Sequence, residues 1–248
     1  MNWLDRLAVE AFVERLKLHR LEGLEARFMV LGKDEVKLPS SEYFLMRGRE
    51  VIEHCEIEGG CGQAFTSHAR NCVLPFSEVP FLDLSLEVNR ALFYSALNAL
   101  LNRLGEVKGT LHCKGVEAEA CGDLLAAEIR KRLRKDDVVL HIGYQPGHVR
   151  ALAKAFDRLL VTDMDPANIG SVKFGVKVLS SSENEEAIRR ARLVLVTGSA
   201  VVNGTLHEII NWCDRYAVEC VIYGVTGKGV AKLLNLPIFC PYARDQGG

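Results

Sequence analysis

Residues 110–122, TLHCKGVEAEACG, hold the densest group of reactive side chains in the chain: His112, Cys113, Glu117, Glu119 and Cys121. Thiolate and imidazole groups favour zinc, copper, nickel or iron over magnesium or calcium. If this stretch is extended, His112 and Cys113 point to opposite faces, whereas Glu117 and Cys121 share a helix face. A soft-metal site built on His112, Cys113 and Cys121 is one interpretation. The other is that Cys121 packs in the core while the acids favour the helix amino end.

Glycine and hydroxyl residues follow successive apolar runs in the segments GYQPGH (143–148), TGSAVVNGT (197–205) and YGVTGKG (223–229). In open parallel sheets, ligands bind outside the carboxyl ends of the strands. Glycine permits close backbone approach, and a helix amino end suits a phosphate or carboxylate. The first segment is not GxGxxG, and Pro146 removes one N–H donor. The three loops predict a ligand cleft at one edge of a sheet.

Two acids, Asp163 and Asp165, follow a further apolar run, about 20 residues beyond the first glycine loop. An acid at this place can bond the ribose hydroxyls of a dinucleotide or of adenosylmethionine. The alternative is an aspartate that caps the following turn, DPANIG. The sequence leaves both interpretations open.

The elements that must position these residues differ between the two halves of the chain. The first half predicts helices over 1–20 and 85–105 (Ser85 as N-cap), and strands over 27–32, 35–38, 51–58 and 61–67. From residue 116 onward helices alternate with apolar strands, which is typical of a mostly parallel sheet between helix layers. We expect an α+β domain over 1–112 and an α/β domain over 113–248.

Composition narrows the class of partner. The 248 residues include 31 basic and 32 acidic side chains, for a net charge of −1, so no basic excess points to nucleic acid. No apolar run approaches the ~20 residues of a membrane span. The amino-terminal segment carries acids and lacks a cleavage site, and eight cysteines without a CxxC pair fit a reducing compartment. We therefore expect a cytoplasmic protein, with a homodimer as the usual assembly.

Four segments, IGYQPGHVRAL, LLVTDMDP, ARLVLVTGSAVVNGTLHEII and VIYGVTGKGV, resemble in this order the putative heavy-metal chelation family. GCGQAFTSH and SALNALLNR resemble two motifs of the family's amino-terminal half. The resemblance implies that residues 1–112 are similar to the enolase N-terminal domain and residues 113–248 to a Rossmann-like domain, with a ligand cleft between them. The implied cleft residues are Thr66, Asn98, Gly143, Gln145, Pro146, Gly147, Asp163, Asp165, Thr197, Gly198, Asn203 and Thr205. The loop GVTGKG departs from the turn of many relatives, so no ligand is carried over from it. We expect its Thr226 to line the cleft and to alter the ligand preference.

Three functions remain open. The first is binding of a heavy-metal ion or a metal–small-molecule complex, with His112, Cys113 and Cys121 as soft ligands and an anionic chelator group at the helix amino ends. The second is an enzyme that binds adenosylmethionine or a dinucleotide at the same strand ends. The third is a scaffold or interaction protein without a small-molecule ligand.

Overall fold

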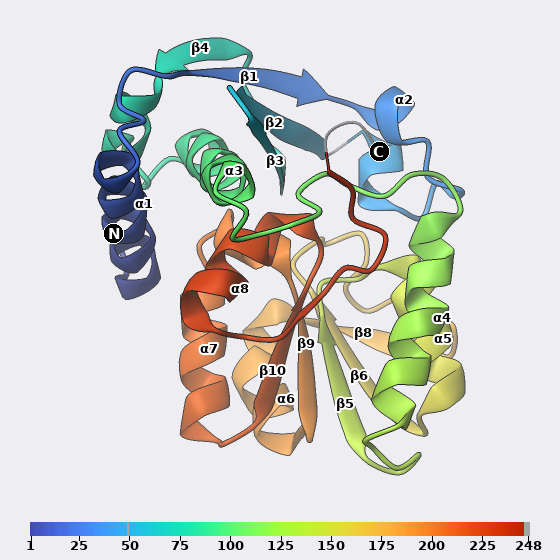
Figure 1. The fold of residues 1–248 in the computed structure, drawn as a ribbon. Coiled ribbons are helices and arrows are strands. Elements are labelled where there is room, and N and C mark those ends of the chain that lie inside the picture. Colours follow the sequence, from blue (N-terminus) through green and yellow to red (C-terminus); the bar gives the residue numbers. More distant parts are fainter. Residues whose placement is uncertain (49, 246–248) are drawn as a thin grey trace.

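The computed structural model describes residues 1–48 and 50–245, which form two β-sheets with helices packed around them (Figure 1). The first part of the chain holds α1 (Trp3–Leu18), β1 (Glu25–Leu31), α2 (Lys33–Val36), β2 (Val51–Ile57), β3 (Gly60–Thr66), β4 (Cys72–Pro75) and α3 (Glu87–Arg103), with the 3₁₀ turns η1 (Phe44–Arg47) and η2 (Phe76–Phe81). The four strands form an antiparallel sheet in the order β3-β2-β1-β4.

Helix α3 lies against this sheet and is buried on all sides between Arg90 and Leu101. Its sequence carries small and apolar residues around its whole circumference, as expected of a helix with no solvent face. In Figure 1 it lies between the antiparallel sheet and the second sheet below. The predicted hairpin around Gly59-Gly60 is confirmed by the pairing of β2 with β3.

Two local predictions are wrong. The run 35–38 is not a strand, because Gly32 caps the short helix α2 and its N–H donates to the Glu35 carboxylate at 2.8 Å. Leu86, not Ser85, occupies the N-cap position of α3, and the Ser85 N–H instead donates to Asp83 at 3.0 Å.

The second part of the chain alternates helices and strands as predicted. It holds α4 (Glu117–Arg130), β5 (Val138–Ile142), α5 (Pro146–Ala155), β6 (Arg158–Asp163), β7 (Val172–Lys173), β8 (Val176–Ser180), η3 (Ser181–Glu183), α6 (Asn184–Arg190), β9 (Leu193–Thr197), η4 (Gly198–Val201), α7 (Leu206–Arg215), β10 (Glu219–Tyr223), η5 (Val225–Gly227), α8 (Lys228–Leu234) and β11 (Ile238–Phe239). The sheet order is β11-β10-β9-β5-β6-β8-β7, parallel throughout except for β7. The mixed α/β architecture with one mostly parallel sheet is confirmed.

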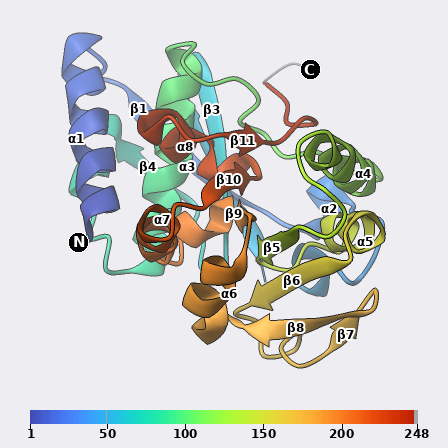
Figure 2. The same cartoon turned by 90° about the horizontal axis from the view of Figure 1, so that it is seen from below.

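Helices cover both faces of this sheet. Helices α4 and α5 pack on one face, and α6 and α7 on the other (Figure 2). The core on the α6–α7 face continues into the core around α1 and α3, so the two parts of the chain share one apolar interior. Among the described residues, no helix is long and apolar enough to cross a membrane.

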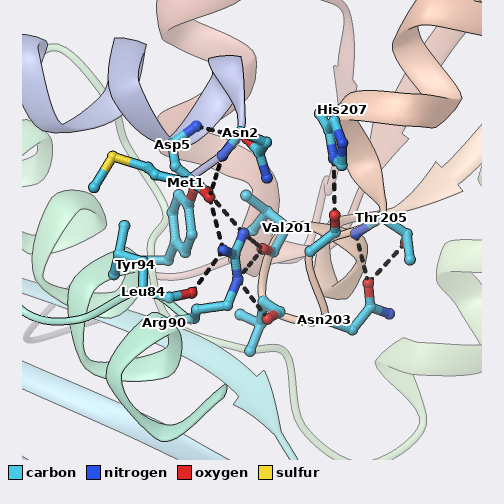
Figure 3. A network of polar contacts seen from close by, with 12 residues as sticks. Met1, Asn2, Asp5, Leu84, Arg90, Tyr94, Val201, Asn203, Thr205 and His207 are labelled. Atoms are coloured by element: carbon cyan, nitrogen blue, oxygen red, sulfur yellow. Dashed lines mark hydrogen bonds and ion pairs between the residues drawn. The ribbon is translucent and has the colours of Figure 1, made fainter. Parts of the chain in front are cut away.

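A buried polar network also joins the two parts (Figure 3). The Arg90 guanidinium on α3 forms an ion pair with Asp5 on α1 at 2.7 Å and donates to the carbonyls of Val201 and Val202. Tyr94 donates its hydroxyl to the same Asp5 carboxylate at 2.6 Å. The chain that follows β9 is therefore held in place by the amino-terminal helices.

Candidate functional site

A cavity of about 670 Å³ lies at the carboxyl ends of β5, β6, β9 and β10. The strand order reverses beside β5, since β6 and β8 lie on one side of it and β9 and β10 on the other. Open α/β sheets bind their ligands at such a reversal. Residues 38–45, Glu50, the end of β3 and the start of α3 supply the opposite wall, so both sheets contribute to the cavity.

Most of the residues expected at a ligand cleft or a metal site line this cavity. They are Thr66, His112, Cys113, Cys121, Gly143, Gln145, Pro146, Asp163, Asp165, Thr197, Gly198, Asn203, Thr205 and Thr226. Asn98 and Gly147 are not among the lining residues. His112 and Cys113 both line it, although an extended strand would have sent them to opposite faces.

Asn98 is fully buried and does not line the cavity. Its amide donates to the carbonyls of Gln63, Val225 and Thr226 at 3.0–3.2 Å, and its oxygen accepts from the Gly229 N–H at 2.8 Å. Every polar atom of the side chain is thus used to join α3 and β3 to the η5–α8 turn. Thr226 acts in the same way, because its hydroxyl accepts from the Phe65 N–H at 3.0 Å.

The amino end of α5 does not offer the open anion site that the glycine loop predicted. Gln145 caps the helix by accepting from the His148 N–H, and its amide donates to the carbonyl of Ala118 at 3.2 Å. Pro146, at the first helical position, has no N–H to donate. Helix α4 covers this end so closely that a Cβ atom on Gly122 would lie 2.1 Å from the Gly147 carbonyl oxygen. Protein groups therefore occupy the place expected for a phosphate or an anionic chelator group.

The two aspartates after β6 hold their own loop. Asp163 accepts from the Tyr144 and Asp165 N–H groups, both at 2.8 Å, so each of its carboxylate oxygens is engaged. Asp165 accepts from the Ala167 N–H at 3.0 Å and lies 3.3 Å from the Arg47 guanidinium. Of the two interpretations that the sequence left open, these contacts match the turn-capping one.

Local hydrogen bonds also engage polar residues at the end of β9 and in the segment that follows it. The Asn203 side-chain oxygen accepts from the Thr205 N–H and hydroxyl at 3.1 and 2.7 Å (Figure 3). Its amide lies 3.3 Å from the sulfur of Met164, which comes from the loop after β6. Thr197 accepts from the Ser199 N–H. These bonds shape the rim of the cavity between β6 and β9.

A thiol and an imidazole face each other at the cavity wall. Cys121 Sγ on α4 lies 3.3 Å from His148 Nε2 on α5, and His148 Nδ1 lies 3.2 Å from His141 Nε2 on β5. Both rings contact the ring of Tyr223, whose hydroxyl donates to the carbonyl of Gly143 at 2.6 Å. Gly143 has a φ of 89°, a conformation that glycine adopts without strain.

Burial sets the protonation of this pair. It lowers the pKa of His148 to about 3, which leaves a neutral imidazole at neutral pH. Burial, followed by the nearby thiols Cys240 and Cys113, raises the pKa of Cys121 well above its usual value. A neutral imidazole is the form that binds metals, and a metal that binds the thiol must displace its proton.

Cys113, Cys240 and His112 line the same cavity. Burial raises the pKa of Cys113 to about 12 and lowers that of His112 to about 4. His112 donates from Nδ1 to the Cys113 carbonyl at 2.6 Å, which leaves Nε2 for other contacts. Within residues 1–48 and 50–245, no three His, Cys, Asp or Glu side chains form a group that could hold a metal ion. His112, Cys113 and Cys121 thus do not form a ready three-ligand set, and their role as ligands stays a prediction.

Sequence reasoning did not single out Cys240 or His148 as ligands. Cys240 directly follows β11, and His148 lies in the first turn of α5 after the first glycine loop. Both positions are at the carboxyl ends of parallel strands, so the strand-end rule applied to every strand would have found them.

The cavity lining is acidic. Six carboxylate side chains line it: Glu50, Glu87, Asp163, Asp165, Glu185 and Glu208. Among the described residues, no lysine or arginine does so, although Arg47 and Arg215 contact Asp165 and Glu185 from outside the lining. Burial, followed by the charges of Asp163 and Glu87, raises the pKa of Glu50 to about 8, so this side chain is mostly protonated at neutral pH. The other five carboxylates of the lining favour a cation over an anion.

Comparisons with known proteins find a family model and solved structures that are similar to this chain. The family model described as "Putative heavy-metal chelation" (DUF364) matches residues 125–237. A DUF364 protein of unknown function from Pyrococcus horikoshii shares the fold with a TM-score of 0.53 at 18% identity, over 90% of this chain and 79% of that one. Another, from Desulfitobacterium hafniense, gives a TM-score of 0.53 at 15% identity, over 74% of this chain and 72% of that one. No curated protein matches the sequence. The resemblance seen in the sequence is confirmed, since residues 125–237 match the model of the putative heavy-metal chelation family.

Proposed function

We propose that this protein binds a heavy-metal ion, carried by a small chelating molecule, in the cavity at the carboxyl ends of the parallel strands. The observation that carries the proposal is the pairing of Cys121 Sγ with His148 Nε2 at 3.3 Å in the wall of that cavity. A thiol and a neutral imidazole are soft donors, suited to zinc, copper, nickel or iron.

The number of donors supports a metal complex over a bare ion. Two facing side chains fill two positions of a metal that takes four or more ligands. A small chelator can supply the remaining donors, and a cavity of about 670 Å³ has room for it. Cys113, Cys240 and His112 lie in the same lining and are candidates for further ligands.

The second candidate, an enzyme that binds adenosylmethionine or a dinucleotide, has less support. Both oxygens of Asp163 already accept backbone N–H groups, one from Tyr144 and one from Asp165, which makes Asp163 a poorer partner for a ribose. The covered end of α5 and the carboxylates of the lining both disfavour a pyrophosphate.

The proposal also includes the fold type and the boundary of the two domains. The order β8-β6-β5-β9-β10-β11 supports a Rossmann-like assignment, since it matches a doubly wound sheet. We propose the division 1–112 and 113–248, with an enolase N-terminal-like first domain.

The test measures nickel binding by equilibrium dialysis and near-UV absorption, with Ni²⁺ added alone and as tridentate complexes. A thiolate–nickel band should appear for the unchanged protein. We expect Cys121→Ser to remove the band and His148→Gln to weaken binding at least about tenfold, as losses of metal-site contacts do.

The matched control is Cys213→Ser, which removes a buried thiol on α7 that lies outside the cavity. It should leave the nickel band and the affinity unchanged. No binding of any nickel species to the unchanged protein would refute the proposal. So would an equal loss in Cys121→Ser and Cys213→Ser.

A further inference from the structure

We propose that the cavity selects a metal complex that is positively charged and carries N–H donors, so that its chelator is an amine rather than a polycarboxylate. This inference rests on the proposed function and specifies the class of ligand. It replaces the anionic chelator that the helix amino ends had suggested.

Charge is the first reason. Besides Glu50, which is mostly protonated at neutral pH, five carboxylates line the cavity, and no lysine or arginine among the described residues does so. Arg47 and Arg215 pair with two of them, Asp165 and Glu185, from outside the lining. A chelator that brings several carboxylates would cancel the charge of a divalent metal and place further negative charge beside Glu87, Asp163 and Glu208. A neutral amine chelator leaves the complex at +2, and a low-dielectric cavity lined by one sign of charge concentrates such an ion.

Two buried polar atoms are the second, independent reason. Asn184 and Tyr43 line the cavity with only 5% of each residue exposed. The Asn184 side-chain oxygen and the Tyr43 hydroxyl have no hydrogen-bond partner among the described residues. A buried polar atom without a partner costs free energy. The amide oxygen can only accept, so the partner that satisfies it must be a donor.

The aromatic lining fits the same ligand. Tyr43, Phe44, Phe65, Tyr144, Trp212, Tyr223 and Phe239 all contribute to the cavity wall. Aromatic faces attract cations and pack against the methylene groups of alkyl amines. They offer no comparable attraction to carboxylates, because the face of the ring carries partial negative charge.

The experiment compares two nickel complexes with the same tridentate skeleton. Diethylenetriamine gives a complex of charge +2 with five N–H groups, whereas iminodiacetate gives a neutral complex with one. Affinities for the full-length protein are measured by calorimetry and by the nickel–thiolate band. We expect the amine complex to bind at least about tenfold more tightly and to weaken with added salt, because attraction between charges is screened.

Substitutions assign this preference to the cavity. Glu208→Gln should weaken the amine complex about threefold or more at low ionic strength and change the iminodiacetate complex less than twofold. Glu208 is exposed on the first turn of α7, so its replacement leaves folding intact. The control is Glu58→Gln, which removes the same charge from the exposed β2–β3 turn outside the cavity. It should change neither affinity.

A third nickel complex tests whether the N–H groups of the chelator are required. Pentamethyl-diethylenetriamine keeps the charge and the three donor nitrogens but has no N–H group. We expect its nickel complex to bind at least about fivefold more weakly than the parent complex, with a smaller difference in Asn184→Leu, because that variant removes the acceptor.

The outcomes separate this inference from the function beneath it. If no nickel species binds, the proposed function itself is wrong. If the iminodiacetate complex binds as tightly as the amine complex, the metal function stands and the charge selection is refuted. If the pentamethyl complex binds as tightly as its parent, the N–H requirement is refuted.

Discussion

Replacing Asp5 by alanine should destabilise the protein strongly, because it breaks the buried ion pair with Arg90 (Figure 3). The Asp5 and Arg90 side chains are 1% and 9% exposed, and their two bonds measure 2.7 and 2.8 Å. Tyr94 donates to the same carboxylate at 2.6 Å. Removing one partner of a buried pair leaves an uncompensated charge and costs ~3–5 kcal/mol. Arg90 keeps its bonds to the carbonyls of Leu84, Val201 and Val202, so we expect about 3 kcal/mol.

The assay is urea unfolding followed by circular dichroism and tryptophan fluorescence. For a chain of this size, about 3 kcal/mol corresponds to a loss of roughly 6–12 °C in the midpoint of thermal unfolding. The control is Glu106→Gln, which breaks an ion pair of similar geometry between Arg15 and Glu106 that is 20% and 26% exposed. Solvent screening should limit its cost to about 1 kcal/mol or less. Equal costs for the two variants would refute the argument from burial.

Two further predictions concern the wall of the cavity. Gly122→Ala should cost about 3 kcal/mol or more, because the new Cβ would lie 2.1 Å from a backbone oxygen of Gly147 and force α4 away from α5. Gly122→Ala should also weaken nickel binding. The control Gly23→Ala, at a site with no atom within 4 Å, should change neither the stability nor the nickel affinity. If Gly122→Ala were as stable as the unchanged protein, the close packing of α4 on α5 would be contradicted. Burial lowers the pKa of His112 to about 4 and of His148 to about 3, so only the unfolded chain takes up these protons as the pH falls from about 6.5 to 4. The free energy of unfolding should therefore decrease as the pH falls through this window. Its slope against pH should be smaller by about 1.4 kcal/mol per pH unit in His148→Gln, which urea unfolding at several pH values would measure. The exposed control His19→Gln should keep the full slope, and an unchanged slope in His148→Gln would show that this residue is not buried in its neutral form.

The similarity to the heavy-metal chelation family and the α/β alternation could be predicted from the sequence because both depend on local patterns. Apolar runs such as VVLHI and LVLVT are typical of parallel strands buried on both faces, and they became β5 and β9. Prediction from local sequence patterns failed for short elements, where the contacts of one or two residues decide the structure. The Glu35 carboxylate accepts from the Gly32 N–H at the first turn, and the helix α2 forms where a strand was expected. The short strands β7 and β11 carry two residues each, too few for a periodic signal.

The cavity wall was largely predictable for a general reason. The carboxyl ends of parallel strands meet at one edge of a sheet, so residues that follow β5, β6 and β9 must lie near one another. Asn98, which the family resemblance and not this rule implied, does not line the cavity and joins the two halves of the chain instead. Asn98 bonds to Val225 and Thr226, more than 120 residues away, and no local pattern reports such a contact.

The sequence by itself determined the long helices, the buried parallel strands and many of the thiols, imidazoles and acids that follow the strand ends. Only the tertiary structure decided which of them meet. The close approach of α4 to α5 brings Cys121 to His148, 27 positions along the chain, and residues 38–45 with Glu50 close the opposite wall. The physical reason is that burial and long-range contacts set both the protonation of a side chain and the partners within its reach, and both exist only once the chain has packed.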